Sequence, residues 1–121
     1  MRLLPKPSLK ASDFEAKWAS LATVELLGLT LAKPPAPGEL ERALAPLHIE
    51  CLASGTPAPG AAKFYFFAQD AASTASLVLC EVSVTLASCR ISGIIKASSP
   101  RLGAAFLVQM KAALAGLTAP A

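Results

Sequence analysis

The stretch KFYFFAQDAASTASLVLCEVSVTLASCRISGIIK, residues 63–96, decides the fold class of this chain of 121 residues. It contains three runs rich in aromatic and branched side chains, at 63–69, 77–86 and 89–96, which is the composition of β-strands. Only short connections separate these runs, whereas a parallel crossover needs about a dozen residues or more. The stretch therefore predicts an antiparallel meander of three strands.

Two further strands are expected upstream of the meander. Residues 23–32 (TVELLGLTLA) and 48–54 (HIECLAS) are short, apolar and rich in branched side chains. A proline-rich segment follows each of them, KPPAPG at 33–38 and GTPAPG at 55–60. Because proline has no amide hydrogen to give to a sheet, both segments are interpreted as loops.

A short helix is predicted ahead of the first strand. Ser12 and Glu15 have the spacing of a capping box, in which each side chain satisfies a backbone amide of the first turn. A helix that runs on through Ser20 would present Phe14 and Trp18 on one face, four residues apart.

Two more helices complete the predicted order. Residues 39–45 (ELERALA) are strong helix formers, and Pro46 is expected to stop that helix. Ser99-Pro100 supplies a cap and a first-turn proline for a last helix that runs to about Gly116. The resulting fold class is α+β, an antiparallel sheet of about five strands with flanking helices.

The composition indicates one folded domain. With 54% hydrophobic and 16% charged residues, a chain of this length can bury a core, and disorder is not expected. The net charge of +3 is spread over basic residues that come singly, and so no nucleic-acid partner is expected. We expect an extended lead-in at 1–11, a domain at 12–117 and a frayed tail at 118–121.

The sequence predicts an intracellular protein without a membrane segment of its own. Charged residues interrupt the apolar runs before they reach the length that a bilayer requires, and the N-terminus lacks the apolar middle of a signal peptide. Cys51, Cys80 and Cys89 are odd in number and form no CxxC pair. They are interpreted as buried, reduced thiols.

Few residues have the pattern of a catalytic or metal-binding site. His48 is the single histidine, and no second histidine or cysteine lies at ligand spacing from it. The sequence contains neither a nucleophile elbow nor a glycine-rich phosphate loop. We therefore expect no enzyme activity, no metal and no cofactor.

Three residues stand out as candidates for binding. Trp18 and Tyr65 are the single Trp and Tyr of the chain, residue types that are frequent where proteins dock, although pattern alone favours a core position for each. Glu81 interrupts an apolar strand. Its carboxylate either points to solvent on the polar side of the alternation or forms the charged rim of a binding surface.

The string FEAKW at 14–18 resembles the FxxxW that opens the C-terminal platform of β-adaptin appendages, also called ears. The resemblance continues in order over residues 12–117. LVLCEVSV at 77–84 is similar to the family's ILAEL strand, and IIKASSP at 94–100 is similar to its LSLKCRAP stretch. The spacing from Trp18 to the helix at residue 39 also looks like that of the family.

The resemblance implies a platform like that of the TATA-binding protein. Such a domain belongs to the β subunit of a clathrin-adaptor-type complex and recruits accessory or coat proteins through short hydrophobic motifs in vesicle-mediated transport. By position, the family's peptide-binding Trp, Tyr and Glu become Trp18, Tyr65 and Glu81. Tyr65 requires a hairpin about two residues longer here, and a gapless match would put Phe67 in its place.

The resemblance also implies a more apolar site than is usual in the family. Leu26 and Leu27 stand where acids would be expected, and only Glu25 is near. A platform without a preceding immunoglobulin-like sandwich looks most like the β subunit of the fourth adaptor complex. That implies a cytoplasmic domain, peripheral on trans-Golgi or endosomal membranes, joined to the other subunits through parts missing here.

Two other functions remain open at the level of sequence. The density of Phe64, Phe66, Phe67 and Phe106 also suits a carrier that holds an apolar small ligand between sheet and helices. A scaffolding piece, whose sheet packs against one partner in another assembly, is the second alternative.

Overall fold

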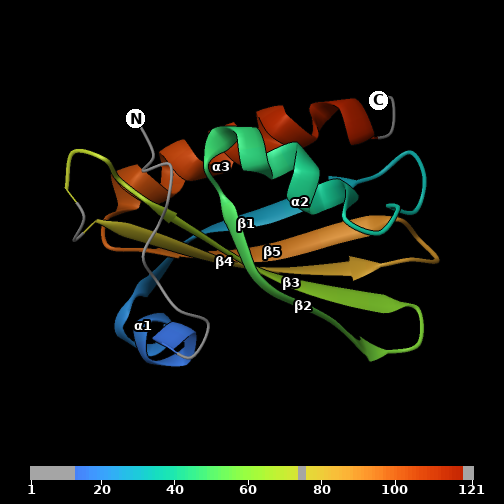
Figure 1. Ribbon diagram of the computed structural model, residues 1–121, viewed down its shortest axis with the longest axis horizontal. Coiled ribbons are helices and arrows are strands. Elements are labelled where there is room, and N and C mark those ends of the chain that lie inside the picture. The colour runs from blue at the N-terminus through green and yellow to red at the C-terminus, as the bar shows by residue number, and fades with distance from the viewer. Residues whose placement is uncertain (1–12, 74–75, 119–121) are drawn as a thin grey trace.

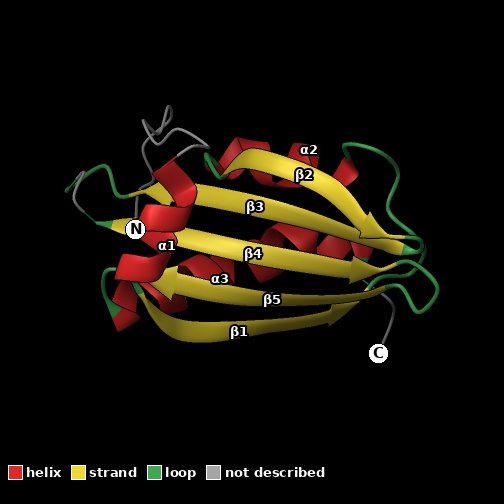
Figure 2. Ribbon diagram, turned by 90° about the horizontal axis from the view of Figure 1, so that it is seen from below, coloured by secondary structure: helices red, strands yellow, loops and turns green. Residues whose placement is uncertain are grey.

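The computed structural model describes residues 13–73 and 76–118, which form one five-stranded antiparallel sheet in the order β1-β5-β4-β3-β2. Helices α2 and α3 cover one face of the sheet, and α1 lies on the other face (Figures 1 and 2). The α+β prediction is therefore confirmed. The elements are α1 (Phe14–Ser20), β1 (Ala22–Thr30), α2 (Glu39–Leu44), β2 (Glu50–Ala58), β3 (Ala61–Gln69), β4 (Leu77–Thr85), β5 (Arg90–Ala97) and α3 (Pro100–Leu114), with 3-10 turns at Ala45–Leu47 and Ala115–Leu117.

Helix α3 closes the main core. As predicted, Ser99 caps it: the Ser99 side chain accepts a hydrogen bond from the Leu102 amide at 3.2 Å, and Pro100 occupies the first turn. Its buried residues recur every three to four positions and so share one face of the helix, which packs on the sheet. These residues are Leu102, Gly103, Phe106, Met110 and Leu114.

The prediction of a loop at 55–60 is wrong for most of that segment. β2 continues to Ala58 and β3 begins at Ala61, which leaves a tight turn in which Gly60 has a φ of +78°. β2 is an edge strand that pairs only with β3, and its register shifts between Gly55 and Ala58. An irregular edge strand tolerates Pro57. Proline has no amide hydrogen, but β2 has no second neighbouring strand that would need to accept one.

Two smaller boundaries also differ from prediction. His48 does not begin a strand, because its φ of 62° lies in the left-handed region, directly after the 3-10 turn. Pro46 lies inside that turn, while α2 itself ends at Leu44. Proline is tolerated there because the first amides of a helical turn have no intrahelical partner.

The expected capping box involves Ser12, which lies outside the described residues, as do the lead-in at 1–11 and residues 119–121 of the tail. Asp13 occupies the cap position of α1 without a side-chain capping bond. Thr118 forms an isolated β-bridge with Leu31. In the part of the chain that the structure describes, no helix is both long and apolar enough to cross a bilayer.

The cysteines are less uniformly buried than predicted. Cys80 is fully buried, and burial raises the pKa of its thiol to about 12. Cys51 and Cys89 are only half-buried, because Cys51 lies on the edge strand β2 and Cys89 in the turn before β5. All three thiols are free.

Gly103 tests the packing of α3 on β1. Alanine is usually better than glycine inside a helix by about 1 kcal/mol, but a methyl group at this position would collide with Cγ2 of Val24. We expect Gly103→Ala to lower the free energy of unfolding by about 1–3 kcal/mol, as overpacked cores do. Urea titration of the wild type and the variant measures this difference in the free energy of unfolding.

Gly116→Ala is the control, because a methyl group there would meet no atom within 4 Å. Val24→Ala placed in the Gly103→Ala background should recover part of the loss, since it removes the colliding group. A Gly103→Ala variant more stable than the wild type would contradict this account of the contact.

Candidate functional site: an aromatic pocket on the open face of the sheet

Helix α1 is held on the open face of the sheet by Phe14. The Phe14 ring is 8% exposed and packs in a small cluster with Phe67, Leu77 and Leu79, all of which are buried. α1 therefore lies across the end of the sheet where β4 begins, and no other helix of residues 13–73 and 76–118 covers the rest of that face (Figure 2).

Phe14 also positions the two candidate aromatic residues. Its ring stacks on Trp18 with a centroid distance of 5.5 Å and an interplanar angle of 19°. It also forms a T-shaped contact with the Tyr65 ring, with a centroid distance of 5.0 Å and an interplanar angle of 68°. Both Trp18 and Tyr65 stay half-buried, and so each ring keeps an accessible surface. Aromatic contacts of this geometry contribute about 0.5–1.5 kcal/mol each beyond the area that they bury.

Lys96 ties the C-terminal end of α1 to strand β5. Its Nζ lies 4.6 Å from the centroid of the Trp18 ring and donates a hydrogen bond to the Trp18 carbonyl at 3.1 Å. The same carbonyl also accepts a hydrogen bond from the Leu21 amide at 3.4 Å, and a cation at the C-terminal end of a helix is favourable. Lys96 therefore fixes the Trp18 ring over the sheet.

Glu81 forms the polar part of the site. It lies on β4 directly opposite Tyr65 of β3, and its carboxylate accepts a hydrogen bond from Nζ of Lys63 at 3.2 Å. The hydrogen bond from Lys63 to Glu81, and the attraction between their charges, raise the pKa of the Lys63 ammonium. Both side chains are partly exposed, so this pair orients the carboxylate more than it stabilises the fold.

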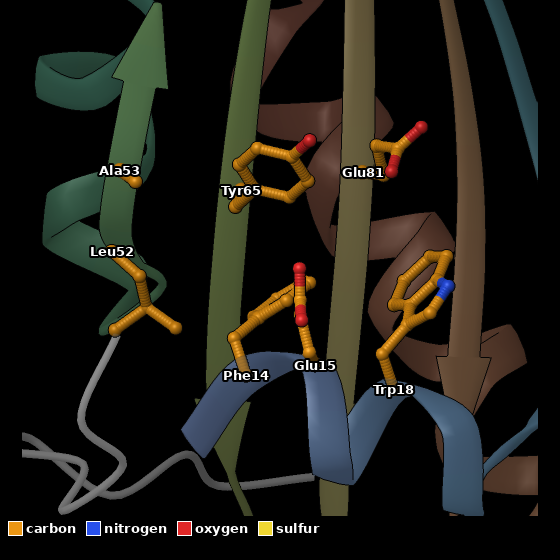
Figure 3. A pocket seen from close by; sticks show the side chains of 7 residues that line it. All are labelled: Phe14, Glu15, Trp18, Leu52, Ala53, Tyr65 and Glu81. Carbon is orange, nitrogen blue, oxygen red and sulfur yellow. The ribbon is translucent and has the colours of Figure 1, made fainter. Parts of the chain in front are cut away.

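These side chains line a pocket of about 450 Å³ (Figure 3). Its walls come from α1, the edge strand β2 and the central strands β3 and β4. A volume of this size accommodates a few side chains or a small ligand. The lining residues are Phe14, Glu15, Trp18, Leu52, Ala53, Tyr65 and Glu81.

The structure brings Trp18, Tyr65 and Glu81 together in this pocket. Phe67, the alternative to Tyr65, lies two residues further along β3 on the same face, but it is 1% exposed and sits beneath Phe14. A ligand in the pocket does not reach Phe67 unless α1 moves.

Glu25 does not lie in the pocket. A β-bulge between Thr23 and Glu25 resets the alternation of β1, so that Val24 and Leu27 both face the helices. Glu25, two residues before Leu27, shares that face, and Leu26 takes the position on the open face.

Sequence reasoning missed Glu15, Leu52 and Ala53 as lining residues. Ala53 pairs directly with Tyr65. A register shift between Cys51 and Ala53 allows the consecutive residues Leu52 and Ala53 both to line the pocket, and the sequence does not reveal that shift. Phe14 was predicted to share a face with Trp18, and the stacking of the two rings confirms it.

The arrangement has the features of an interaction module. In the described ranges, no group of three or more His, Cys, Asp or Glu side chains is placed to hold a metal ion. The pocket instead offers aromatic and aliphatic surface with carboxylates at its edge, which is the composition of a site that docks another protein. Fold and site together define an α+β platform with an aromatic pocket on its open face.

The comparison with protein families identifies that platform. Residues 4–114 match the model of the Beta2-adaptin appendage, C-terminal sub-domain, and the chain belongs to this family. A search of curated proteins found no match. Adaptin appendage domains are non-enzymatic interaction modules of adaptor complexes, which bind accessory proteins in clathrin-adaptor trafficking. Membership implies a cytoplasmic domain that is peripheral on a coated membrane.

The pairing of Lys63 with Glu81 can be tested through the pKa of Lys63. We expect NMR titration of the Lys63 side chain to give a pKa above 10.5, the ordinary value, and Glu81→Gln to lower it toward that value, because the hydrogen bond and the charge attraction from Glu81 are the two largest causes that raise it. Since the folded-state pKa is the raised one, the stability from the pair is complete below pH 10.5 and falls as the pH rises through the raised pKa. An unchanged Lys63 pKa in Glu81→Gln would show that the pair does not form.

Proposed function

We propose that the pocket between Trp18 and Tyr65 binds short hydrophobic peptide motifs of accessory proteins. The observation that carries the proposal is the pair of half-buried aromatic rings, fixed by Phe14 beside an open pocket of about 450 Å³. Rings of this kind bury a large apolar area with little loss of side-chain freedom, because each has only two rotatable bonds.

The peptide docks as a short helix or turn, with one or two apolar side chains inserted between Trp18, Leu52 and Tyr65. Each square ångström of apolar surface removed from water contributes about 25 cal/mol. The carboxylates of Glu15 and Glu81 lie at the edge of the pocket, where they accept hydrogen bonds from peptide amides and set its orientation. A site this small corresponds to an affinity in the micromolar range, about −8 kcal/mol at 1 μM.

Weak binding of this kind suits a coat. Many copies of a micromolar site on one membrane bind a partner with several motifs far more tightly than one copy does. Selectivity then comes from the number of motifs in an accessory protein rather than from a single strong contact.

The proposal extends to the whole subunit. We propose further that the chain belongs to the β subunit of the fourth adaptor complex, at trans-Golgi or endosomal membranes. Affinity purification of the full-length subunit from its own cells tests this, since the co-purifying large subunit and its organelle identify the complex.

The structure gives no particular support to a carrier of apolar ligands. Phe66, Phe67 and Phe106 are each no more than 1% exposed and fill the two cores on either side of the sheet. Their density is therefore explained by packing.

A peptide selection tests the proposed site. Phage-displayed random peptides of about 16 residues are selected on the wild-type domain, and a recovered peptide is titrated by fluorescence anisotropy. We expect Tyr65→Ala and Trp18→Ala each to weaken binding at least tenfold, about 1.4 kcal/mol or more, because each removes a wall of the pocket.

Val108→Ala is the matched control, because Val108 is 68% exposed on α3, on the opposite side of the sheet. Thermal unfolding of every variant establishes that each is folded. If Tyr65→Ala and Trp18→Ala bind the peptide as well as Val108→Ala does, the pocket is not the binding site.

A further inference from the structure

The connection between β1 and α2 carries the sequence KPPAP at 33–37, which we call the proline segment. It consists of two pairs in which a residue precedes a proline, Lys33-Pro34 and Ala36-Pro37, with Pro35 between them. Residues 34–36 lie in neither a helix nor a strand, and they contribute nothing to the aromatic pocket. The segment is therefore a surface feature for which the proposed function does not account.

The sequence of the proline segment restricts its backbone to an extended conformation. Each proline fixes its own φ at about −65°, and each residue that precedes a proline is kept out of the α region. At least one of these two constraints acts on every residue from Lys33 to Pro37. The conformation that satisfies both is polyproline II, a left-handed helix with three residues per turn and no internal hydrogen bonds.

The burial of the proline segment fits a helix of three residues per turn. Pro35 is half-buried, whereas all four residues of the two pairs, Lys33-Pro34 and Ala36-Pro37, are exposed. In polyproline II, residues three positions apart share an edge of the helix. One edge of the segment therefore faces the domain, and the other two edges present both pairs to solvent.

The fold holds the chain directly before the proline segment. The Leu31 amide donates a hydrogen bond to the Cys89 carbonyl at 2.7 Å, and the Ala32 amide donates one to the Leu117 carbonyl at 2.9 Å. Leu31 itself is buried in the main core. The start of the segment is therefore fixed to the end of β1.

A type II turn holds the other end of the segment. The Glu39 amide donates a hydrogen bond to the Ala36 carbonyl at 3.0 Å, and Pro37 and Gly38 take the two central positions, with a Gly38 φ of 77°. Oε1 of Glu39 accepts a hydrogen bond from the Ala36 amide at 3.3 Å. A ligand held at both ends in its bound conformation loses little freedom when it binds.

The polar groups of the proline segment are open to a partner. Within residues 13–73 and 76–118, the carbonyls of Lys33, Pro34 and Pro35 accept no hydrogen bond, and Lys33 forms no ion pair. The carbonyls can accept hydrogen bonds from donor side chains of another protein. The ammonium group of Lys33 favours a partner with a carboxylate at the same place.

We propose that the proline segment is a ligand for an SH3-type domain of a partner protein. Pro34 and Pro37 insert between the aromatic side chains of the SH3 groove, and Lys33 lies beside an acidic residue at its edge. The spacing from Pro34 to Pro37 is that of the PxxP ligands that such grooves recognise.

This site is separate from the aromatic pocket. α1 precedes β1 and the proline segment follows it, so that the two lie at opposite ends of the sheet (Figure 1). β1 has nine residues, which corresponds to about 30 Å of strand. A partner on the proline segment therefore leaves the pocket between Trp18 and Tyr65 accessible.

An array of purified SH3 domains tests the proposal. The fluorescently labelled protein is applied to the array, and each SH3 domain that retains it is titrated by fluorescence anisotropy. We expect at least one SH3 domain to bind in the micromolar range, and Pro34→Ala and Pro37→Ala each to weaken that binding at least tenfold. Lys33→Glu should weaken it at least threefold with unchanged thermal unfolding, because Lys33 is exposed.

Pro57→Ala is the matched control. The tetrapeptide Pro-Ala-Pro-Gly occurs at 35–38 and again at 57–60, but the second copy lies in the β2–β3 hairpin, with Pro57 inside a strand. We expect Pro57→Ala to bind the SH3 domain as tightly as the wild type does. In NMR spectra, the SH3 domain should shift the amide signals of Lys33 and Ala36 and leave the Trp18 indole signal in place.

The proposal is wrong if no SH3 domain of the array binds the wild type. It is also wrong if Pro34→Ala and Pro37→Ala, shown to be folded by thermal unfolding, bind a recovered SH3 domain as tightly as Pro57→Ala does. Binding that Lys33→Glu leaves unchanged would overturn the contact between Lys33 and an acidic residue. The peptide titrations of the aromatic pocket are independent of all three results.

Discussion

The site depends on the burial of one ring, Phe14. α1 has only seven residues, too few to be a stable helix in water, so its position depends on what it packs against. Phe14 supplies that contact by inserting over Phe67, Leu77 and Leu79. The same ring then holds Trp18 and Tyr65 in place, and so the helix and the pocket form together.

The two faces of the sheet differ in how far helices cover them. On one face, α2 and α3 bury a continuous core with residues from β1, β3, β4 and β5, and Cys51 of β2 packs against it, which makes the sheet a rigid support. On the other face, α1 covers only one end. There the half-buried rings of Trp18 and Tyr65 pack on Phe14 and keep accessible surface beside the pocket. Binding groups on a rigid element lose little freedom when a ligand is bound.

Local signals in the sequence predicted most of the fold. Ser99-Pro100 marks the start of α3 because a cap and a first-turn proline act within one turn, and the alternation after Cys80 separates the faces of β4 without knowledge of its neighbours. Features that depend on partners were not predictable. Pro57 predicts a loop, unless it is already known that β2 lies at the edge of the sheet. A bulge that no local sequence signal predicts places Glu25 on the face covered by the helices and Leu26 on the open face.

Intermolecular NOEs between a selected peptide and the aromatic protons of the domain test the central claim most directly. The account predicts NOEs from the peptide's methyl groups to the Trp18 indole and the Tyr65 ring, with Phe14 shifted but still packed on the sheet. NOEs that instead reach only the outer surface of α3, around Val108, would contradict it.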